Sequence, residues 1–248
     1  MRRYTYDAKN YPLSEIALGS IQKHYPDVQD LSLLHEHVPS KKIGELAKII
    51  GKDLADTNFY KIFDKLLEDY VSLGEILVQR FGNIRINIPN QDKDGTVLPF
   101  HQGQWVGNGL GLRTVWLPFT DAYDSNSLQI VNLMDSRAIT NACKEWDYLR
   151  LQEECKKYCE PVNIKKGQFI LFTQEHIHGA AANRTGKTRM SIDVRLLLKD
   201  GQPHRKWPGA YFRKLHDTDI HSRKVEIKDN DNVVMYAEYE GFKTRYID

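Results

Sequence analysis

Apolar positions recur with a helical period through the first third of the chain. Segments 42–50 and 59–78 both carry apolar residues three and four positions apart, the spacing that places them on one face of a helix. In the second segment these residues are Ile62, Phe63, Leu66, Leu67, Tyr70 and Val71. The pattern therefore predicts a helical front end over residues 1–82.

The pattern changes after Gly82. Short alternating or β-branched runs follow, separated by turn residues. They lie at 84–88, 97–105, 112–119, 128–131, 169–172 and 190–198. A helical insertion at 138–160 interrupts them. Helices followed by many short strands favour a mainly β fold with flanking helices, a sandwich or barrel, over a parallel α/β sheet.

No repeat or linker divides the chain, so we predict a single domain over 1–248. The helical front end (1–82) precedes a β-barrel core (83–198) and a polar C-terminal extension (199–248). The extension is predicted to be either a lid or an extra layer, and the sequence leaves both open. Its aromatic residues include Trp207, Tyr211, Phe212, Tyr236, Tyr239 and Phe242.

The charge balance, the apolar runs and the cysteine content indicate which partners and which cellular environment to expect. The chain has 35 basic and 33 acidic residues, a net charge of +2, so nothing attracts it globally to nucleic acid or an anionic membrane. Its apolar runs are far shorter than the roughly 20 residues that a membrane span needs, and the N-terminus is not a secretory signal. The three cysteines, Cys143, Cys155 and Cys159, suit reduced thiols. We predict a cytoplasmic protein that acts on a small molecule, with no nucleic-acid or membrane partner.

Three of the nine histidines stand out, because they lie at the ends of predicted strands. These are His101, His176 and His178. Histidines on two neighbouring strands can converge on one metal ion while the sheet holds their geometry. His176 and His178 are two residues apart on one strand, so both are candidates to face the barrel.

Segment 167–196 is predicted to form a strand, a tight turn and a return strand. The return strand places Arg189, Ser191, Asp193 and Arg195 on one face by its period of two. A buried arginine beside a hydroxyl is suited to binding a carboxylate, because its planar guanidinium contacts both oxygens. The alternative is that these arginines pair with acidic groups on the sheet surface.

Several motifs occur in a fixed order between residues 84 and 198. They are Pro–aromatic–His–Gln at 99–102, Trp–Leu–Pro at 116–118, Asp-x-x-x-x-Asn-Ser-Leu at 121–128 and an HG…N…R-x-S ending at 178–191. This set resembles the phytanoyl-CoA dioxygenase-like branch of the iron(II)/2-oxoglutarate-dependent oxygenases, with members from bacterial surface-carbohydrate gene clusters the most similar. The resemblance implies a double-stranded β-helix, a jelly-roll or cupin-like barrel backed by N-terminal helices.

The resemblance also implies roles for individual residues. His101 and His178 would bind Fe(II). Arg189 and Ser191 would bind the distal carboxylate of 2-oxoglutarate, with Trp116 beside that cosubstrate. O₂ completes the cofactor set, and the implied reaction converts 2-oxoglutarate to succinate while attacking an unactivated C–H bond. We therefore expect an oxidoreductase, a non-haem iron dioxygenase.

One position departs from the family's His-x-Asp pattern. Gly103 replaces the aspartate that completes the family's two-histidine, one-carboxylate iron site, and glycine has no side chain that could coordinate the iron. Three hypotheses stay open. A chloride or bromide takes the position, as in aliphatic halogenases of the superfamily, or Glu175 or Asp121 supplies a carboxylate from another direction, or the site is inactive and the barrel only binds ligands. A substitution of the natural residue at 103 would also leave an ordinary hydroxylase.

Polar residues near the predicted metal motif are candidates for substrate binding. Arg85 and Asn87 share one face of the strand at 84–88, and Gln104 and Trp105 follow His101 closely. Such a set suits a sugar, nucleotide or amino-acid derivative, although each residue is equally explained as a polar position on a sheet. We expect hydroxylation of such a molecule or, given the glycine, halogenation. The alternative is an inactive or cupin-like protein that binds or isomerises a ligand.

Overall fold

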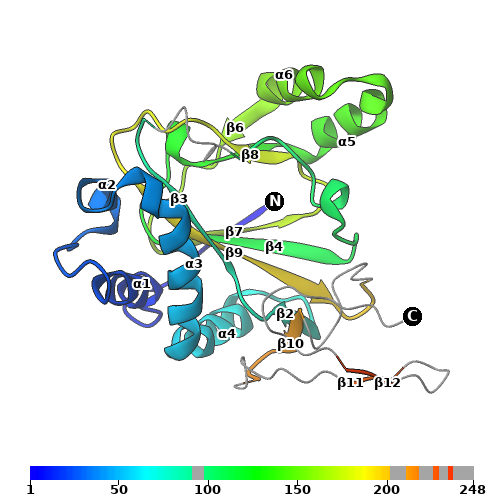
Figure 1. Ribbon diagram of the computed structural model, residues 1–248. Helices are drawn as coiled ribbons and strands as arrows, with labels where there is room; N and C mark the ends of the chain where they lie inside the picture. The colour runs from blue at the N-terminus through cyan, green and yellow to red at the C-terminus, as the bar shows by residue number, and fades with distance from the viewer. Residues whose placement is uncertain (91–97, 202–210, 218–225, 229–233, 237–248) are drawn as a thin grey trace.

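The structure is a computed structural model that describes residues 1–90, 98–201, 211–217, 226–228 and 234–236 (Figure 1). Over these residues the chain forms two facing antiparallel sheets and a separate hairpin. Helices cover the outer side of the larger sheet, and a helical insertion extends beyond the smaller one. The class is therefore mixed α/β with N-terminal helices, whereas the sequence pattern predicted a mainly β protein.

The larger sheet is built around its longest strand, β9 (Arg189–Leu198). One side of β9 pairs with β4 (Leu112–Pro118), and the other pairs first with β3 (Asn83–Asn87) and then with β2 (Ile76–Gln79). The strand order is β1-β7-β4-β9-β2-β10, with β3 also on β9. The remaining strands are β1 (Arg2–Thr5), β7 (Gln168–Thr173) and β10 (Phe212–Lys214).

The smaller sheet lies opposite the larger one. Its strand β5 (Leu128–Val131) pairs antiparallel with β6 (Cys159–Pro161) and with β8 (His178–Ala180). Apolar side chains from both sheets form one buried cluster, which holds the sheets face to face. The cluster consists of Trp116, Ala122, Leu128, Ile130, Val162, Ile164, Ile170 and Phe172.

The closed barrel expected from the sequence is not seen in the described part of the chain. The two sheets are separate hydrogen-bonded units there. The chain passes from β4 to β5 through a short 3-10 helix, η5 (Asp124–Asn126), so strand pairing stops before the second sheet begins. Packing of side chains, rather than a continuous ladder, therefore joins the sheets.

Helices cover the outer face of the larger sheet (Figure 1). Phe59 and Phe63 of α4 share one buried core with Val115 and Leu117 of β4 and Ile192 of β9. This burial explains the apolar spacing in the sequence. The helices of this layer are α1 (Leu13–Gln22), α2 (Leu34–His37), α3 (Ile43–Asp53) and α4 (Phe59–Tyr70), with 3-10 turns η1 (Leu31–Leu33), η2 (Ser40–Lys42) and η3 (Leu54–Asp56).

The predicted helices at 42–50 and 59–78 are found as α3 and α4, but the second prediction ran too far. Helix α4 ends at Tyr70 because Val71 is extended, and Gly74 then turns the chain with a φ of +69°. The following apolar residues form strand β2 on the large sheet. A strand at the N-terminus, β1, also lies inside the front end that was expected to be helical.

The predicted strand at 97–105 is wrong over its described residues. The chain from Leu98 to Phe100 has no regular structure, His101 makes an isolated bridge, and η4 (Gln104–Val106) follows. Pro99 lacks an N–H group for a ladder. Gly103 has helical torsion angles, φ −57° and ψ −34°, so the chain turns directly after the predicted metal motif.

The helical insertion consists of α5 (Leu133–Ala142), η6 (Cys143–Glu145) and α6 (Tyr148–Tyr158). It begins earlier than predicted, because the Asn132 side chain caps α5 by accepting a hydrogen bond from Asp135 N (3.0 Å). Asp147 caps α6 in the same way, accepting from Arg150 N (2.8 Å). The two helices extend beyond β6 (Figure 1).

The C-terminal extension contributes an additional strand to the larger sheet. Strand β10 pairs with β2, and the buried guanidinium of Arg213 binds the Asp64 carboxylate of α4 at 2.6 and 2.7 Å. A hairpin of β11 (Glu226–Lys228) and β12 (Val234–Tyr236) follows. Trp207, Tyr239 and Phe242 lie outside the described residues. Among the helices described, none has the length and apolar character to cross a membrane.

Candidate active site

His101 and His178 lie side by side, although they are far apart in the sequence. His101 N donates to His178 O (3.0 Å), and His178 N donates to His101 O (2.9 Å). Their ring centroids are 4.4 Å apart, and the Phe172 ring packs 5.1 Å from that of His178. A backbone bridge at the start of β8 thus brings together the two imidazoles that the sequence proposed as metal ligands.

In both imidazoles Nδ1 is held by a backbone carbonyl, which leaves Nε2 as the nitrogen that can bind a metal ion. Nδ1 of His101 is hydrogen-bonded to Pro99 O (2.8 Å), and Nδ1 of His178 to His176 O (3.0 Å). A carbonyl only accepts, so each Nδ1 carries the proton and each Nε2 keeps its lone pair. Burial lowers the pKa of both rings, that of His178 to about 3, so both are neutral at neutral pH. Neutral imidazoles held from behind by carbonyl groups fit a divalent transition-metal ion.

The carboxylates expected to complete the metal site lie elsewhere. Glu175 forms a two-point ion pair with Arg137 at 2.7 and 3.1 Å, and this partner lowers its pKa. Asp121 accepts a hydrogen bond from Lys166 N (2.9 Å). Within the described ranges, no three His, Cys, Asp or Glu side chains are grouped so that they could hold a metal ion. The histidine pair therefore has no carboxylate ligand in this part of the chain.

The space beside Gly103 is filled. A Cβ atom added at Gly103 would overlap the Gln174 amide oxygen and lie 2.7 Å from Gln174 Cδ. Gln174 is buried, and its Nε2 donates to Thr114 Oγ1 (2.8 Å). Sequence reasoning missed Gln174, because only the fold brings the segment before β8 against the turn after His101.

Arg189, Ser191 and Trp116 form a buried polar cluster on the inner face of the larger sheet. Ser191 Oγ accepts from Trp116 Nε1 (3.1 Å) and from one Nη of Arg189 (3.0 Å). The guanidinium lies 5.9 Å from the centre of the Trp116 ring. Burial lowers the pKa of Arg189 to about 10, and no carboxylate within the described residues forms an ion pair with it. A buried cation of this kind is suited to binding the carboxylate of a ligand.

Two asparagines hold the loops around Arg189. Asn126 O accepts from Arg189 Nε (3.0 Å). Asn183 donates to Asn87 O (2.9 Å) and to Lys187 O (2.7 Å), which ties the turn before β9 to the end of β3. The Asn126 and Asn183 positions belong to the motifs at 121–128 and 178–191, and they act by fixing backbone geometry.

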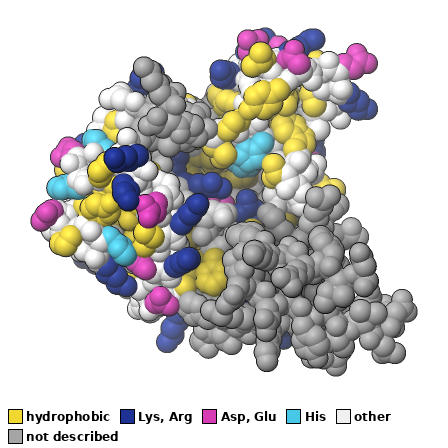
Figure 2. All heavy atoms as spheres, viewed as in Figure 1, with side chains coloured by type: hydrophobic (Ala, Val, Ile, Leu, Met, Phe, Trp, Pro, Cys, Tyr) yellow, Lys and Arg dark blue, Asp and Glu magenta, His cyan; other side chains and the backbone are white. Residues whose placement is uncertain are grey.

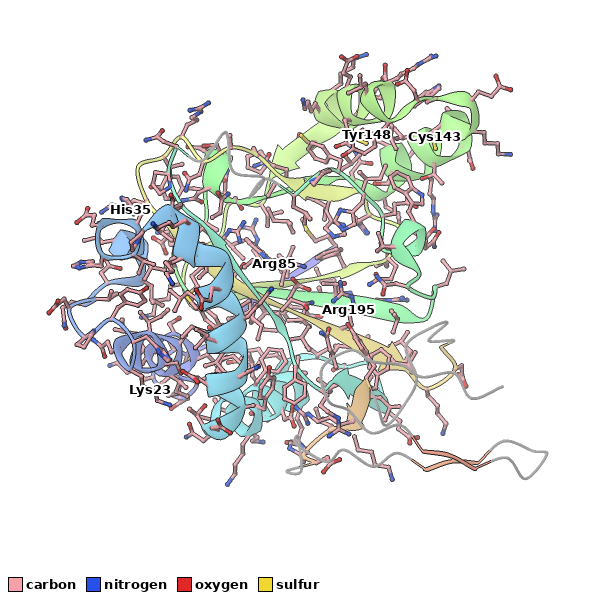
Figure 3. The ribbon with its side chains drawn as sticks, in the orientation of Figure 1. Lys23, His35, Arg85, Cys143, Tyr148 and Arg195 are labelled. Atoms are coloured by element: carbon pink, nitrogen blue, oxygen red, sulfur yellow. The ribbon has the colours of Figure 1, made fainter. Side chains whose placement is uncertain are left out.

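A second charged cluster, Arg85–Asp193–Arg195, lies next to the histidine pair. Arg85 Nε is 2.9 Å and Arg195 Nη1 is 3.1 Å from the Asp193 carboxylate. These three charges influence the pKa of His101, so they share its surroundings. Figure 3 shows Arg85 and Arg195 in the space between the two sheets. The period-two pattern placed Asp193 and Arg195 on the face of Arg189, but sequence reasoning assigned neither to the site.

The four candidate substrate residues separate into two groups. Arg85 and Asn87 belong to β3, but Asn87 is buried and donates to Asn126 O (3.4 Å) and Ala181 O (3.3 Å), so it is part of the loop scaffold. Gln104 and Trp105 lie in η4 beside His101. Trp105 and His101 line an open apolar groove of about 330 Å³, whose other walls are Leu98, Pro99, Phe100, Val106, Tyr148 and Leu151. Figure 2 shows hydrophobic side chains gathered below α5 and α6.

His176 does not join the histidine pair. Its Nδ1 is hydrogen-bonded to Thr173 Oγ1 (2.9 Å), and its Nε2 lies 3.5 Å from the N-terminal amine of Met1. Burial lowers its pKa to about 4. Only its backbone carbonyl touches the site, through the bond to His178.

Two of the three cysteines, Cys155 and Cys159, have the features of inert thiols. Cys155 lies on α6 of the insertion and is buried in a cluster with Phe100, Val131, Ile139 and Ile177, and burial raises its pKa to about 11. Burial also raises the pKa of Cys159. All three cysteines are free. Raised pKa values keep the Cys155 and Cys159 thiols protonated and weakly nucleophilic.

The paired imidazoles and the buried guanidinium are the two parts of the candidate site, and comparison of the sequence with known protein families identifies the family. The family described as phytanoyl-CoA dioxygenase (PhyH) matches residues 48–191, more than half of the chain. The chain belongs to this family of Fe(II)/2-oxoglutarate-dependent oxygenases, which confirms at the level of the family the resemblance seen in its motifs. A comparison with curated proteins found no match.

Several solved structures are similar to the chain at low identity. The non-heme monooxygenase ThoJ in its nickel complex is 17% identical, with 84% of this chain and 78% of that chain covered and a TM-score of 0.43. HygX from Streptomyces hygroscopicus with nickel and 2-oxoglutarate bound is 11% identical, with 79% and 81% covered and a TM-score of 0.43. SnoN, a non-heme alpha ketoglutarate dependent epimerase from nogalamycin biosynthesis, is 17% identical, with 70% of each chain covered and a TM-score of 0.43.

Proposed function

We propose that this protein is an Fe(II)- and 2-oxoglutarate-dependent oxygenase that hydroxylates an unactivated C–H bond of a small molecule. The observation that carries the proposal is the neutral His101–His178 pair, placed between the same two sheets as the buried Arg189 cluster. When bound, Fe(II) with 2-oxoglutarate and O₂ would supply the oxidising power for that reaction. The two facing sheets are consistent with the two halves of a jelly roll.

The protein's own residues bind and orient the reactants. The Nε2 atoms of His101 and His178 would hold the metal. The Arg189 guanidinium and the Ser191 hydroxyl bind the far carboxylate of 2-oxoglutarate, and Trp116 fixes the hydroxyl from the other side. Because this cluster is buried, water competes weakly for the carboxylate and each charged hydrogen bond is strengthened.

The surroundings of Gly103 favour hydroxylation over halogenation. A halide would need open space beside the metal on the Gly103 side, and the Gln174 amide takes that space. The third hypothesis, a binding protein with an inactive site, is the alternative function, because two histidines without a carboxylate are a minimal metal site.

Succinate formation separates the enzyme from the binding protein. Incubation with Fe(II), ascorbate and 2-oxoglutarate is expected to release succinate, even without substrate, at a rate above that of a metal-free sample. Added chloride or bromide is expected to leave the rate unchanged, whereas halide-stimulated turnover would restore the halogenase hypothesis. If no succinate forms while 2-oxoglutarate still binds, the protein is a ligand-binding module.

We further propose that the substrate is a polar molecule with one apolar or ring face. The groove beside His101 supports the apolar face, since Trp105 and Tyr148 offer aromatic walls there. The partly exposed Arg85 supports a polar or anionic group on the same molecule, because its guanidinium lies between the sheets with only Asp193 as an acidic partner among the described residues. Sugars, nucleotides and aromatic amino-acid derivatives all have this combination.

A panel of such compounds tests the groove. Members that bind are expected to stimulate succinate formation, and Trp105→Ala is expected to raise their KM about 10-fold, since losing part of an aromatic wall removes roughly 1.4 kcal/mol of apolar contact. Substrate-free succinate formation should not change in this variant. If Trp105→Ala leaves KM unchanged for every stimulating compound, the groove is not the substrate site.

A further inference from the structure

Gln174 and Gly103 form a matched pair beside the histidines. Gly103 N donates to Gln174 O (3.1 Å), so the two backbones are in direct contact. The side chain of Gln174 then folds over Gly103, and its amide oxygen takes the position where a residue-103 side chain would begin. Gly103 has an ordinary helical φ of −57°, so lack of space, and not backbone strain, is what excludes a side chain there.

The orientation of the Gln174 amide is fixed. Its Nε2 donates to Thr114 Oγ1 on the inner face of β4, which leaves Oε1 directed towards Gly103. The next residue, Glu175, binds Arg137 with its side chain in partly exposed surroundings, so residues 174 and 175 turn in different directions. Only 2% of the Gln174 surface is exposed. A buried amide oxygen held in this way is pre-organised to act as a metal ligand at a fixed point.

We propose that Gln174 supplies the oxygen ligand that Gly103 cannot supply to the metal. The inference rests on the proposed function, because it assumes that His101 and His178 hold the ion. Amide oxygens are ligands for hard divalent ions, and Fe(II) accepts oxygen together with imidazole. An amide is neutral, so the ion would keep one more positive charge than in a site with a carboxylate. The role of Gly103 is then to leave room for the Gln174 amide, because any side chain at residue 103 would overlap it.

Metal affinity of the full-length protein tests this role independently of turnover. Ni²⁺ is titrated calorimetrically in the presence of 2-oxoglutarate. Gln174→Ala is expected to weaken Ni²⁺ binding at least about 10-fold, the low end of the loss seen when groups around a metal are removed. Gly103→Ala leaves Gln174 in the chain but takes its space, so the same loss is expected.

Two double variants sharpen the result. Gly103→Ala with Gln174→Ala is expected to lose no more affinity than either single change, because both remove one interaction. Gly103→Asp with Gln174→Ala is expected to bind Ni²⁺ at least as tightly as the original protein, because a carboxylate then enters the vacated space. The matched control is Gln129→Ala. Gln129 is also a buried amide, on β5, and its Nε2 donates to Asp124 O (2.8 Å) and Ser127 O (3.4 Å), so Ni²⁺ affinity should stay within about 2-fold.

The outcomes separate this inference from the proposed function. If folded Gln174→Ala and Gly103→Ala both keep the original Ni²⁺ affinity, Gln174 is not a ligand while the oxygenase proposal stands. If neither the original protein nor the Gly103→Asp, Gln174→Ala variant binds Ni²⁺, both fail. Thermal melting verifies folding. Should Gln174→Ala not fold, Gln174→Asn withdraws the oxygen by one methylene and is expected to show the same loss, and unchanged affinity in that variant overturns the role.

Discussion

Replacing Arg189 with alanine is expected to weaken 2-oxoglutarate binding by about 2 to 5 kcal/mol, which is roughly 30-fold to several thousand-fold in Kd. The guanidinium is buried and has no acidic partner among the described residues. It therefore holds a desolvated positive charge that a ligand carboxylate can neutralise. Isothermal titration with 2-oxoglutarate and Ni²⁺ measures the change directly.

Controls separate the charge from the fold. Arg189→Lys keeps the charge but loses the planar two-point geometry, so an intermediate loss is expected. Arg113→Ala is the matched control, because Arg113 is on β4 of the same sheet and, among the described residues, its guanidinium donates to the backbone oxygens of Leu110 and Leu112. An unchanged Kd in folded Arg189→Ala would remove this residue from the cosubstrate site.

The second large effect is expected at the histidine pair. His178→Ala or His101→Ala is expected to weaken metal binding by more than about 100-fold, because loss of a direct ligand exceeds the 10- to 100-fold loss seen for outer residues. Succinate formation should fall to the level of the metal-free sample. Calorimetry with Ni²⁺ and the succinate assay measure the two effects separately.

His176 provides the control for that experiment. It is buried two residues from His178, but its ring contacts Thr173 and the N-terminal amine. His176→Ala keeps the backbone carbonyl that holds His178 Nδ1, so metal affinity should change little. If His176→Ala removes metal binding and His178→Ala does not, the assignment of the ligand is reversed.

Much of the candidate site was predictable, because strand periodicity and short sequence motifs locate its residues without knowledge of long-range contacts. The period of two along 189–195 placed Arg189 and Ser191 on one face, and the structure shows them hydrogen-bonded on the inner side of β9. The ordered motifs located His101 and His178, which the structure brings within one backbone bridge. The front-end helices α3 and α4 were predictable from apolar spacing, because the residues that each helix buries recur every three or four positions along its sequence.

Other features depended on contacts between distant segments. The apolar residues after Tyr70 are equally compatible with a longer helix and with strand β2, and pairing with β9 decides between them. The segment at 97–105 has strand-forming residues, yet Pro99 and the turn at Gly103 leave only one bridge. Local propensity is weak where tertiary pairing competes with it.

The sequence by itself pointed to the family and to Arg189, Ser191, Trp116 and the two imidazoles as candidate site residues, because ordered motifs and strand periodicity are properties of the chain alone. Only the tertiary structure decided what stands beside Gly103, since Gln174 reaches that space through the pairing of two segments far apart in the sequence. It also decided that Glu175 and Asp121 lie away from the histidines, because Arg137 and the backbone of Lys166 hold their carboxylates elsewhere. A missing side chain can be read from a sequence, but the group that fills its space is set by packing.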